Sequence, residues 1–204
     1  MTGWKKSTLV ALASALALHA WVAAASSPPT ELVETFHQTL LGLLGADNDF
    51  HTRLARIEPA IDRAFDLEFM AGKVLGRGWK KLTPEQRSEW LDAFARLTAA
   101  NYAGRFVGEA GPSFETLGEE EGAHGTRVVR TQLVDPAGKN VDLTYRLRET
   151  PDGWKIIDCY LDGTVSEIAM RRSEYGAVLR NDGFDALLAA VKRKSEQLAS
   201  EPAK

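Results

Sequence analysis

The first half of the chain carries apolar residues at the three-to-four-residue spacing that places them on one face of an α-helix. Thr83 and Gln86 flank Pro84 in the pattern of a capping box, so the longest helix has a marked start. Pro59 lies inside another apolar pattern and predicts a kink or a restart there. The spacing predicts four helices, at about 30–44, 50–64, 67–75 and 84–107.

The period changes to two after Gly108, Gly111 and Pro112, where β-strands become the favoured structure. Turn sequences at 135–138 and 151–153 join the strand patterns, so neighbouring strands should be antiparallel. The pattern predicts four strands, at about 113–118, 126–134, 141–148 and 154–161. Helical spacing then returns in two segments, at about 165–175 and 184–191.

This order of elements predicts one α+β domain from residue 26 to 204, with a polar tail from about residue 195. It holds a four-stranded antiparallel sheet packed against about six helices. No internal linker is long enough to divide the domain.

The N-terminus has the pattern of a signal peptide over residues 1–25. Lys5 and Lys6 are followed by an apolar run, and small residues up to Ala25 suit cleavage there. A membrane anchor is the alternative, but the run covers only about 17 residues and includes His19, which is short for a membrane span. We therefore expect an exported protein whose signal is removed.

Composition excludes several function classes. The formal net charge is −3 and the basic residues are dispersed, so nucleic-acid binding is not expected. The one cysteine, Cys159, lies in a strand pattern, where a small buried apolar residue is the favoured interpretation. His37, His51 and His124 lack metal-ligand spacing, and His37 is interpreted as a residue at the edge of the core.

The sequence contains no nucleophile elbow, phosphate-binding loop or dinucleotide fingerprint, so no enzyme activity, cofactor or metal is predicted. Asp158 and Asp162 flank the end of a strand, so catalysis by a pair of carboxylates is a minor alternative. The favoured interpretation is that Asp162 belongs to a turn and that Asp158 caps a backbone segment or bridges to a neighbour. Arg171 and Arg172 have two interpretations, a solvated helix face paired with nearby glutamates or a charged group at a cavity mouth or docking face.

Residues 65–94 combine a dense apolar run, a glycine interruption at 76–78 and Trp79. The run predicts an apolar wall. The interruption is interpreted as a turn between helices, with a flexible gate beside a pocket as the alternative.

Two stretches resemble a known family. DLEFMAGKVLGRGWKKLTPEQRSEWLDAF, residues 66–94, is similar to the signature of the toluene-tolerance family, the MlaC-like soluble lipid-binding components of an ABC-type lipid transport system. WKIIDCYLDGTVSEIAMRRSEYGAVLRNDGFDALLAAVKRK, residues 154–194, extends the resemblance over nearly all of the mature chain.

One segment departs from the usual pattern of that family. Residues 162–166 read DGTVS, one residue longer than the usual E-G-V-S, and with 171–175 they resemble the hopanoid-associated HpnM-like branch. The resemblance therefore leaves both a hopanoid and a phospholipid open as the ligand.

The resemblance implies a twisted sheet set against helices around a deep apolar cavity that binds lipid. It implies a periplasmic carrier, a monomer, that exchanges its lipid transiently with membrane complexes. A lipid-modifying or isomerase-like enzyme using Asp158 or a tyrosine, and a scaffold of a membrane complex, are the alternatives. Candidate lining residues, chosen by face and hydrophobicity, are Phe69, Val74, Leu75, Tyr102, Leu143, Tyr145, Leu147 and Ile157.

Overall fold

The computed structural model describes residues 28–45, 49–136 and 140–200. The predicted signal peptide lies outside the described residues. The N-terminal elements are α1 (Pro29–Leu41), α2 (Phe50–Ala64), α3 (Leu67–Leu75), the 3₁₀ helix η1 (Trp79–Lys81) and α4 (Pro84–Arg105). The strands are β1 (Ser113–Glu121), β2 (Arg127–Val134), β3 (Val141–Thr150), β4 (Gly153–Leu161) and β5 (Val165–Ser166), with the 3₁₀ helix η2 (Ala123–Gly125) between β1 and β2. The chain continues through α5 (Glu167–Asn181) and α6 (Phe184–Ser200).

Local capping explains where the helices begin. The Thr83 Oγ1 accepts a hydrogen bond from the Gln86 backbone N–H at 3.2 Å, and the Gln86 side chain accepts from the Thr83 N–H at 3.1 Å. This is the predicted capping box, and it starts α4 at Pro84. The helix α2 runs through Pro59 as one element, so the predicted restart does not occur.

The sheet is an antiparallel meander in the order β1-β2-β3-β4-β5. The prediction of four strands was wrong by one. Residues Val165 and Ser166 form a fifth strand, paired with Leu161 and Tyr160. Two residues are too few for an alternating pattern, so periodicity has nothing to detect there.

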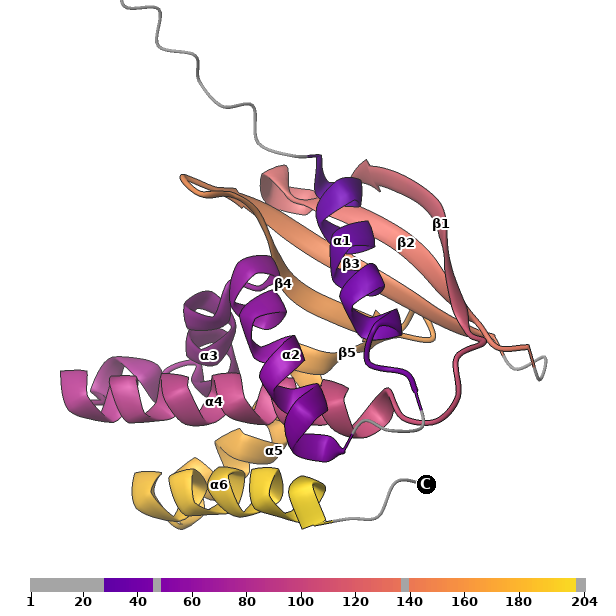
Figure 1. Cartoon of the computed structure of the whole chain (residues 1–204). Coiled ribbons are helices and arrows are strands. Elements are labelled where there is room, and N and C mark those ends of the chain that lie inside the picture. The colour runs from indigo at the N-terminus through magenta and orange to yellow at the C-terminus, as the bar shows by residue number, and fades with distance from the viewer. Residues whose placement is uncertain (1–27, 46–48, 137–139, 201–204) are drawn as a thin grey trace, which may run out of the picture.

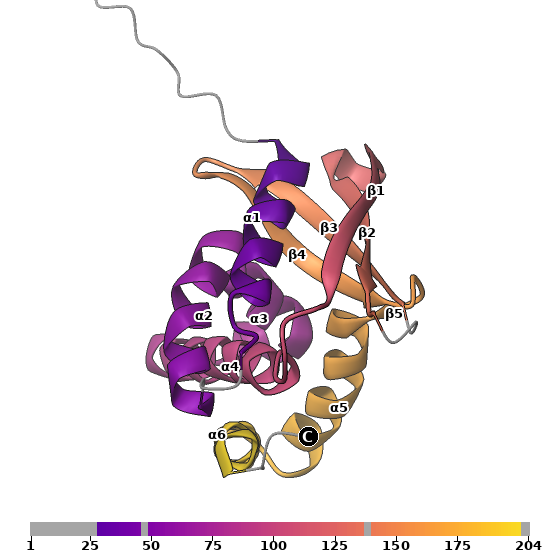
Figure 2. The same cartoon turned by 45° about the vertical axis from the view of Figure 1, so that its right-hand side comes forward.

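The helices enclose one face of the sheet and extend away from it (Figure 1). Helix α1 lies across the sheet, and α4 packs against both α2 and α6. Turned by 45°, the molecule shows α5 leaving the end of β5 and descending towards α6 (Figure 2). Helix α5 therefore joins the sheet to the helical part, with α3 packed against it.

A dense core forms where α3 meets the first half of α4. Trp90 and Phe94 are fully buried, and the Trp90 indole N–H donates to the Ala71 carbonyl at 3.2 Å. Gly72 lies against the Trp79 ring. A β-carbon on Gly72 would be 3.4 Å from that ring. The apolar run predicted as a wall in residues 65–94 is therefore packed core, and none of its residues lines the cavity between the sheet and the helices.

Candidate functional site

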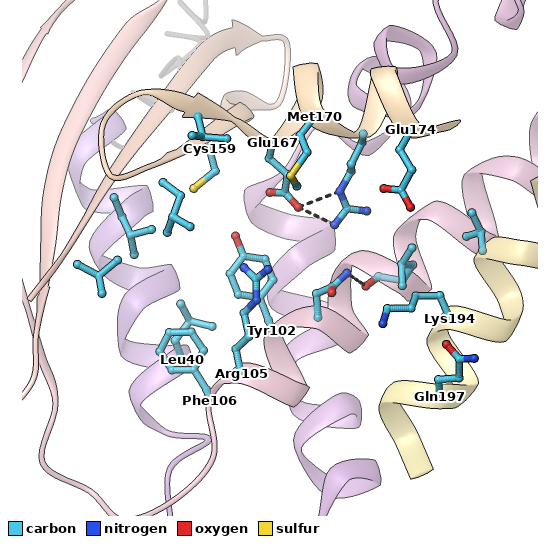
Figure 3. Close-up of a pocket in the computed structure, with 18 of the residues that line it drawn as sticks. Leu40, Tyr102, Arg105, Phe106, Cys159, Glu167, Met170, Glu174, Lys194 and Gln197 are labelled. Atoms are coloured by element: carbon cyan, nitrogen blue, oxygen red, sulfur yellow. Dashed lines mark hydrogen bonds and ion pairs between the residues drawn. The ribbon is translucent and has the colours of Figure 1, made fainter. Parts of the chain in front are cut away.

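A cavity of about 690 Å³ lies between the sheet and the helices α4, α5 and α6. Its volume falls within the roughly 300–1,000 Å³ of typical small-molecule sites. Apolar side chains line the part next to α1 and the sheet; Leu40, Phe106, Leu133, Leu143 and Leu161 are among them. Leu40 and Phe106 appear together in the close-up (Figure 3).

The other part of the cavity, towards α5 and α6, carries polar groups. Figure 3 shows Glu174, Lys194 and Gln197 around this part, whereas Arg105 lies beside Tyr102 and Phe106. Glu174, Lys194 and Gln197 are exposed to solvent, so water reaches this side of the cavity. The cavity is thus amphipathic, with an apolar end beneath the sheet and a polar rim beside α6.

A buried ion pair lies in the lining contributed by α5. Arg171 is only 6% exposed, and its Nε and Nη2 donate to the Glu167 Oε1 at 3.0 and 2.6 Å. The pair joins residues one helical turn apart, which is the i, i+4 geometry of helix ion pairs. The guanidinium carbon of Arg171 lies 5.5 Å from the centre of the Phe94 ring. The two interpretations of Arg171 are therefore combined, because it pairs with a glutamate and lines the cavity.

The half-buried Tyr102 and the buried Tyr145 and Cys159 provide weakly polar lining. Burial raises the pKa of Tyr102 and of Tyr145 well above the usual value, so both hydroxyls stay protonated. Burial likewise raises the pKa of the Cys159 thiol. Cys159 is a free, buried thiol, as the sequence predicted. This part of the cavity therefore offers no charged nucleophile.

His37 stands behind Tyr145 rather than in the cavity lining. Its Nε2 is 3.0 Å from the Tyr145 hydroxyl, and its ring stacks on Phe114 with centroids 3.7 Å apart. Burial lowers the pKa of His37 to about 4. A neutral histidine thus fixes the Tyr145 side chain from behind, and it lies in the core rather than at its edge.

Asp158 serves as a structural cap. Its two carboxylate oxygens accept hydrogen bonds from the Ser166 hydroxyl at 2.6 Å and from the backbone N–H groups of Cys159 and Ile168 at 2.9 and 3.2 Å. It is not among the lining residues. Catalysis by Asp158 in this cavity is therefore contradicted by its position, and the capping interpretation holds.

Three of the eight candidate lining residues, Tyr102, Leu143 and Tyr145, line the cavity. The other five lie outside its lining. Val74, Leu75 and Leu147 are buried in the packed core. Two cations lie over the Phe69 ring. The ring centre is 4.4 Å from the Arg148 guanidinium carbon and 5.0 Å from the Lys73 Nζ. Lipid binding by any of the eight stays a prediction.

A β-bulge accounts for the position of the fifth, Ile157. Cys159 pairs with Tyr145, so a regular ladder would place Ile157 opposite Leu147 on the face towards the cavity. The register instead shifts, Ile156 pairs with Leu147, and Ile157 is the extra residue. Alternation along the sequence cannot show such a shift.

Residues 76–78 form a packed turn rather than a gate. A β-carbon at Gly78 would lie 2.4 Å from the Leu179 Cδ2 of α5, and neither Gly76 nor Gly78 lines the cavity. The turn holds the back of α5, whose other side faces the cavity.

The described residues contain neither a group of metal-ligating side chains nor a membrane-spanning helix. Within residues 28–45, 49–136 and 140–200, no three histidine, cysteine, aspartate or glutamate side chains are grouped closely enough to hold a metal ion. No helix in the same ranges has the length and hydrophobicity needed to cross a membrane.

The fold and the cavity define a class of protein, a small α+β domain with an amphipathic cavity between its sheet and its helices. The family model described as MlaC protein matches residues 32–193, so the chain belongs to the MlaC family. This confirms the resemblance to the MlaC-like family, while the resemblance to the HpnM-like branch stays a prediction.

Known proteins are similar to the chain, and two of them are informative. One is the intermembrane phospholipid transport system binding protein MlaC of Haemophilus influenzae, 26% identical over 141 residues. The match covers 67% of this chain and spans 64% of the length of that relative. The other is the structure of a phospholipid-binding protein from Ralstonia solanacearum in complex with a phospholipid, with a TM-score of 0.75 and 22% identity. That structure covers 85% of this chain and is itself covered completely, and it establishes the fold.

Proposed function

We propose that this protein is a periplasmic carrier that takes a membrane lipid into the cavity beneath the sheet and shuttles it between membrane complexes. The observation that carries the proposal is the amphipathic cavity, with its apolar part beneath the sheet and its polar rim open to solvent. Burying one acyl CH₂ group yields roughly 0.8 kcal/mol, so an apolar cavity can hold a lipid chain without a charged anchor. The two similar proteins, both described as binding phospholipid, support the same role.

The cavity also supports the carrier over an enzyme that modifies lipids. The tyrosines in the lining are held protonated by burial, and Asp158 is committed to capping α5. A carrier needs release as well as binding, and we expect transient docking on a membrane complex to favour the lipid-free form of a monomer.

Phospholipid and hopanoid are the two ligand classes to compare. Lipid should be extracted from the protein purified from its native host and identified by mass spectrometry. Recovery of either class in about equimolar amount supports the carrier. Recovery of neither would overturn it and favour the scaffold, for which the exposed Leu161, Val165 and Met170 would be the docking patch.

A cavity-filling variant tests the site itself. Leu143→Trp places a large ring in the space that the lipid would fill, so we expect bound lipid to fall at least tenfold while the fold persists. Leu117→Trp is the matched control, because Leu117 is 55% exposed on β1 and lies outside this cavity. Equal lipid content in the two variants would exclude this cavity as the carrier site.

A further inference from the structure

Residues 69–84, which run from α3 to the start of α4, carry only positive charge. This stretch contains four lysine or arginine residues and no aspartate or glutamate, although the whole chain has a formal net charge of −3. A fifth cation reaches the same place from α5, because the Arg172 Nη2 lies 3.1 Å from the position that a β-carbon on Gly76 would take. Together these side chains form a basic face, which consists of Lys73, Arg77, Lys80, Lys81 and Arg172.

The cations of the basic face are exposed and lack anionic partners. None of the five forms an ion pair or a side-chain hydrogen bond with a residue that the structure describes. Lys73 instead lies over the Phe69 ring, with its Nζ 5.0 Å from the ring centre. The carboxylates at the end of β1 differ, since three of them pair with arginines of β2. The positive charge of the basic face is therefore available to a partner.

Negative charge is concentrated elsewhere, in and just before β1. Residues 109–121 contain five glutamates and no lysine or arginine. Figure 1 shows α3 and the start of α4 on the side of the molecule away from β1. A molecule with its charges separated in this way turns its positive side towards an anionic surface.

The side chains around these cations favour a lipid surface over a partner protein. Protein–protein interfaces centre on desolvated aromatic or apolar anchors and are poor in lysine. The four large apolar side chains that are exposed among the described residues all lie outside residues 69–84. Trp79 is no such anchor, since its ring packs against Gly72 and lies 5.3 Å from the Arg87 guanidinium carbon. An anionic bilayer needs no anchor, because each lysine or arginine near its surface strengthens binding by about fivefold.

We propose that the basic face docks the protein on anionic lipid head groups at a membrane surface, at a site separate from the cavity. No residue of the basic face lines the cavity. A docked protein can therefore hold or lack a ligand in the cavity. This docking goes beyond the carrier function, because it raises the concentration of the protein beside an anionic membrane whatever the cavity contains.

Flotation with vesicles tests the lipid surface. Protein purified from its native host is mixed with phosphatidylcholine vesicles and with vesicles of equimolar phosphatidylcholine and phosphatidylglycerol. We expect at least about tenfold tighter binding to the anionic vesicles, and its loss between about 0.1 M and 1 M salt, where the Debye length falls from about 10 to about 3 Å. Equal binding to the two kinds of vesicle, or none to either, would overturn the proposal and leave the basic face to an acidic partner protein.

A pair of double variants assigns the docking to the basic face. Lys80→Gln with Lys81→Gln should weaken binding to the anionic vesicles by roughly twentyfold, since two contributions of about fivefold are lost. Arg56→Gln with Lys192→Gln is the matched control, because it removes the same charge from exposed positions on α2 and α6. The control should retain the affinity of the wild type. Equal losses in the two double variants would show that overall charge causes the binding, and would overturn the role of this face.

A third variant separates docking from the carrier function. Leu143→Trp obstructs the cavity and should leave binding to the anionic vesicles unchanged. Loss of vesicle binding in Leu143→Trp would refute a docking site separate from the cavity. Lys80→Gln with Lys81→Gln should in turn keep the lipid that co-purifies with the wild type. Failure of docking is thus measured on vesicles, whereas failure of the carrier function is measured as missing lipid.

Discussion

The two halves of α4 carry similar side chains but meet different surroundings. In the first half, Trp90 and Phe94 are buried against α3, and the Trp90 indole is hydrogen-bonded to the Ala71 carbonyl. In the second half, Tyr102 lines the cavity instead, as does Phe106 directly after the helix ends. One helix thus contributes both to a filled core and to the wall of a hollow.

The difference comes from what lies opposite each half rather than from hydrophobicity. Helix α3 fills the space beside the first half, whereas the second half faces a sheet across a cavity. Ala99, Ala100 and Ala103 are buried with at most 1% exposure, and such small side chains allow neighbouring helices to approach α4 closely. Apolar residues therefore mark burial, while the spacing of the neighbouring elements determines whether the space is filled.

The largest expected effect comes from removing a large side chain from the packed first half of α4. Trp90→Ala removes a fully buried side chain and its hydrogen bond, so we expect the free energy of unfolding to fall by about 3–5 kcal/mol. Urea denaturation measures it. Phe106→Ala, at the cavity, should cost clearly less because this ring is only half-buried and already borders empty space. Equal losses in the two variants would remove the distinction between the halves.

The next effect concerns His37, which supports the cavity wall through Tyr145. The folded protein keeps the ring neutral down to a pKa of about 4, whereas the unfolded chain protonates near 6.5. The unfolded state therefore binds more protons between these values, and the free energy of unfolding should fall by about 3 kcal/mol as the pH drops from 6.5 to 4.

Two histidine variants isolate this contribution. His37→Gln should remove most of the acid-dependent loss seen in urea denaturation between pH 6.5 and 4. His51→Gln should preserve it, because that ring lies at the surface. An unchanged pH profile in His37→Gln would mean that other groups cause the loss.

A smaller effect is expected at Gly78, in the packed turn that supports α5. Gly78→Ala would place a methyl group 2.4 Å from the Leu179 Cδ2 and 3.2 Å from the Leu75 carbonyl, so one of them must shift. We expect a loss of about 1–3 kcal/mol in the free energy of unfolding. If the clash with Leu179 is the cause, adding Leu179→Ala should make the Gly78→Ala substitution less costly, as a double-mutant cycle would show. Additive losses would locate the strain at the Leu75 carbonyl.

The sequence predicted most of the elements because their signals are local. The capping box at Thr83 starts α4, and alternation along β3 places Tyr145 and Leu147 on the buried side. The fifth strand and the bulge at Ile157 depend on pairing between strands, so no local signal marks them. The number of strands and the absence of Ile157 from the cavity lining therefore could not be predicted.

The cavity was harder to predict than the fold, because lining residues and core residues have the same composition. Leu143 and Leu147 lie on the same strand face, yet one lines the cavity and the other is buried in the core. The spacing of Glu167 and Arg171 was a usable signal for their ion pair, but the sequence could not show that the pair is buried. Burial of that pair depends on α4 and α6 packing beside α5.

The smallest expected effect tests the start of α4, at its filled end. Thr83→Ala removes the hydroxyl that accepts from the Gln86 N–H, and the loss of an N-cap costs about 1 kcal/mol. Urea denaturation should show that decrease, while lipid binding should be unchanged because Tyr102 lies about five turns further along the helix. Weaker lipid binding in Thr83→Ala would show that fraying at the filled end reaches the cavity, and that the two halves of α4 are coupled.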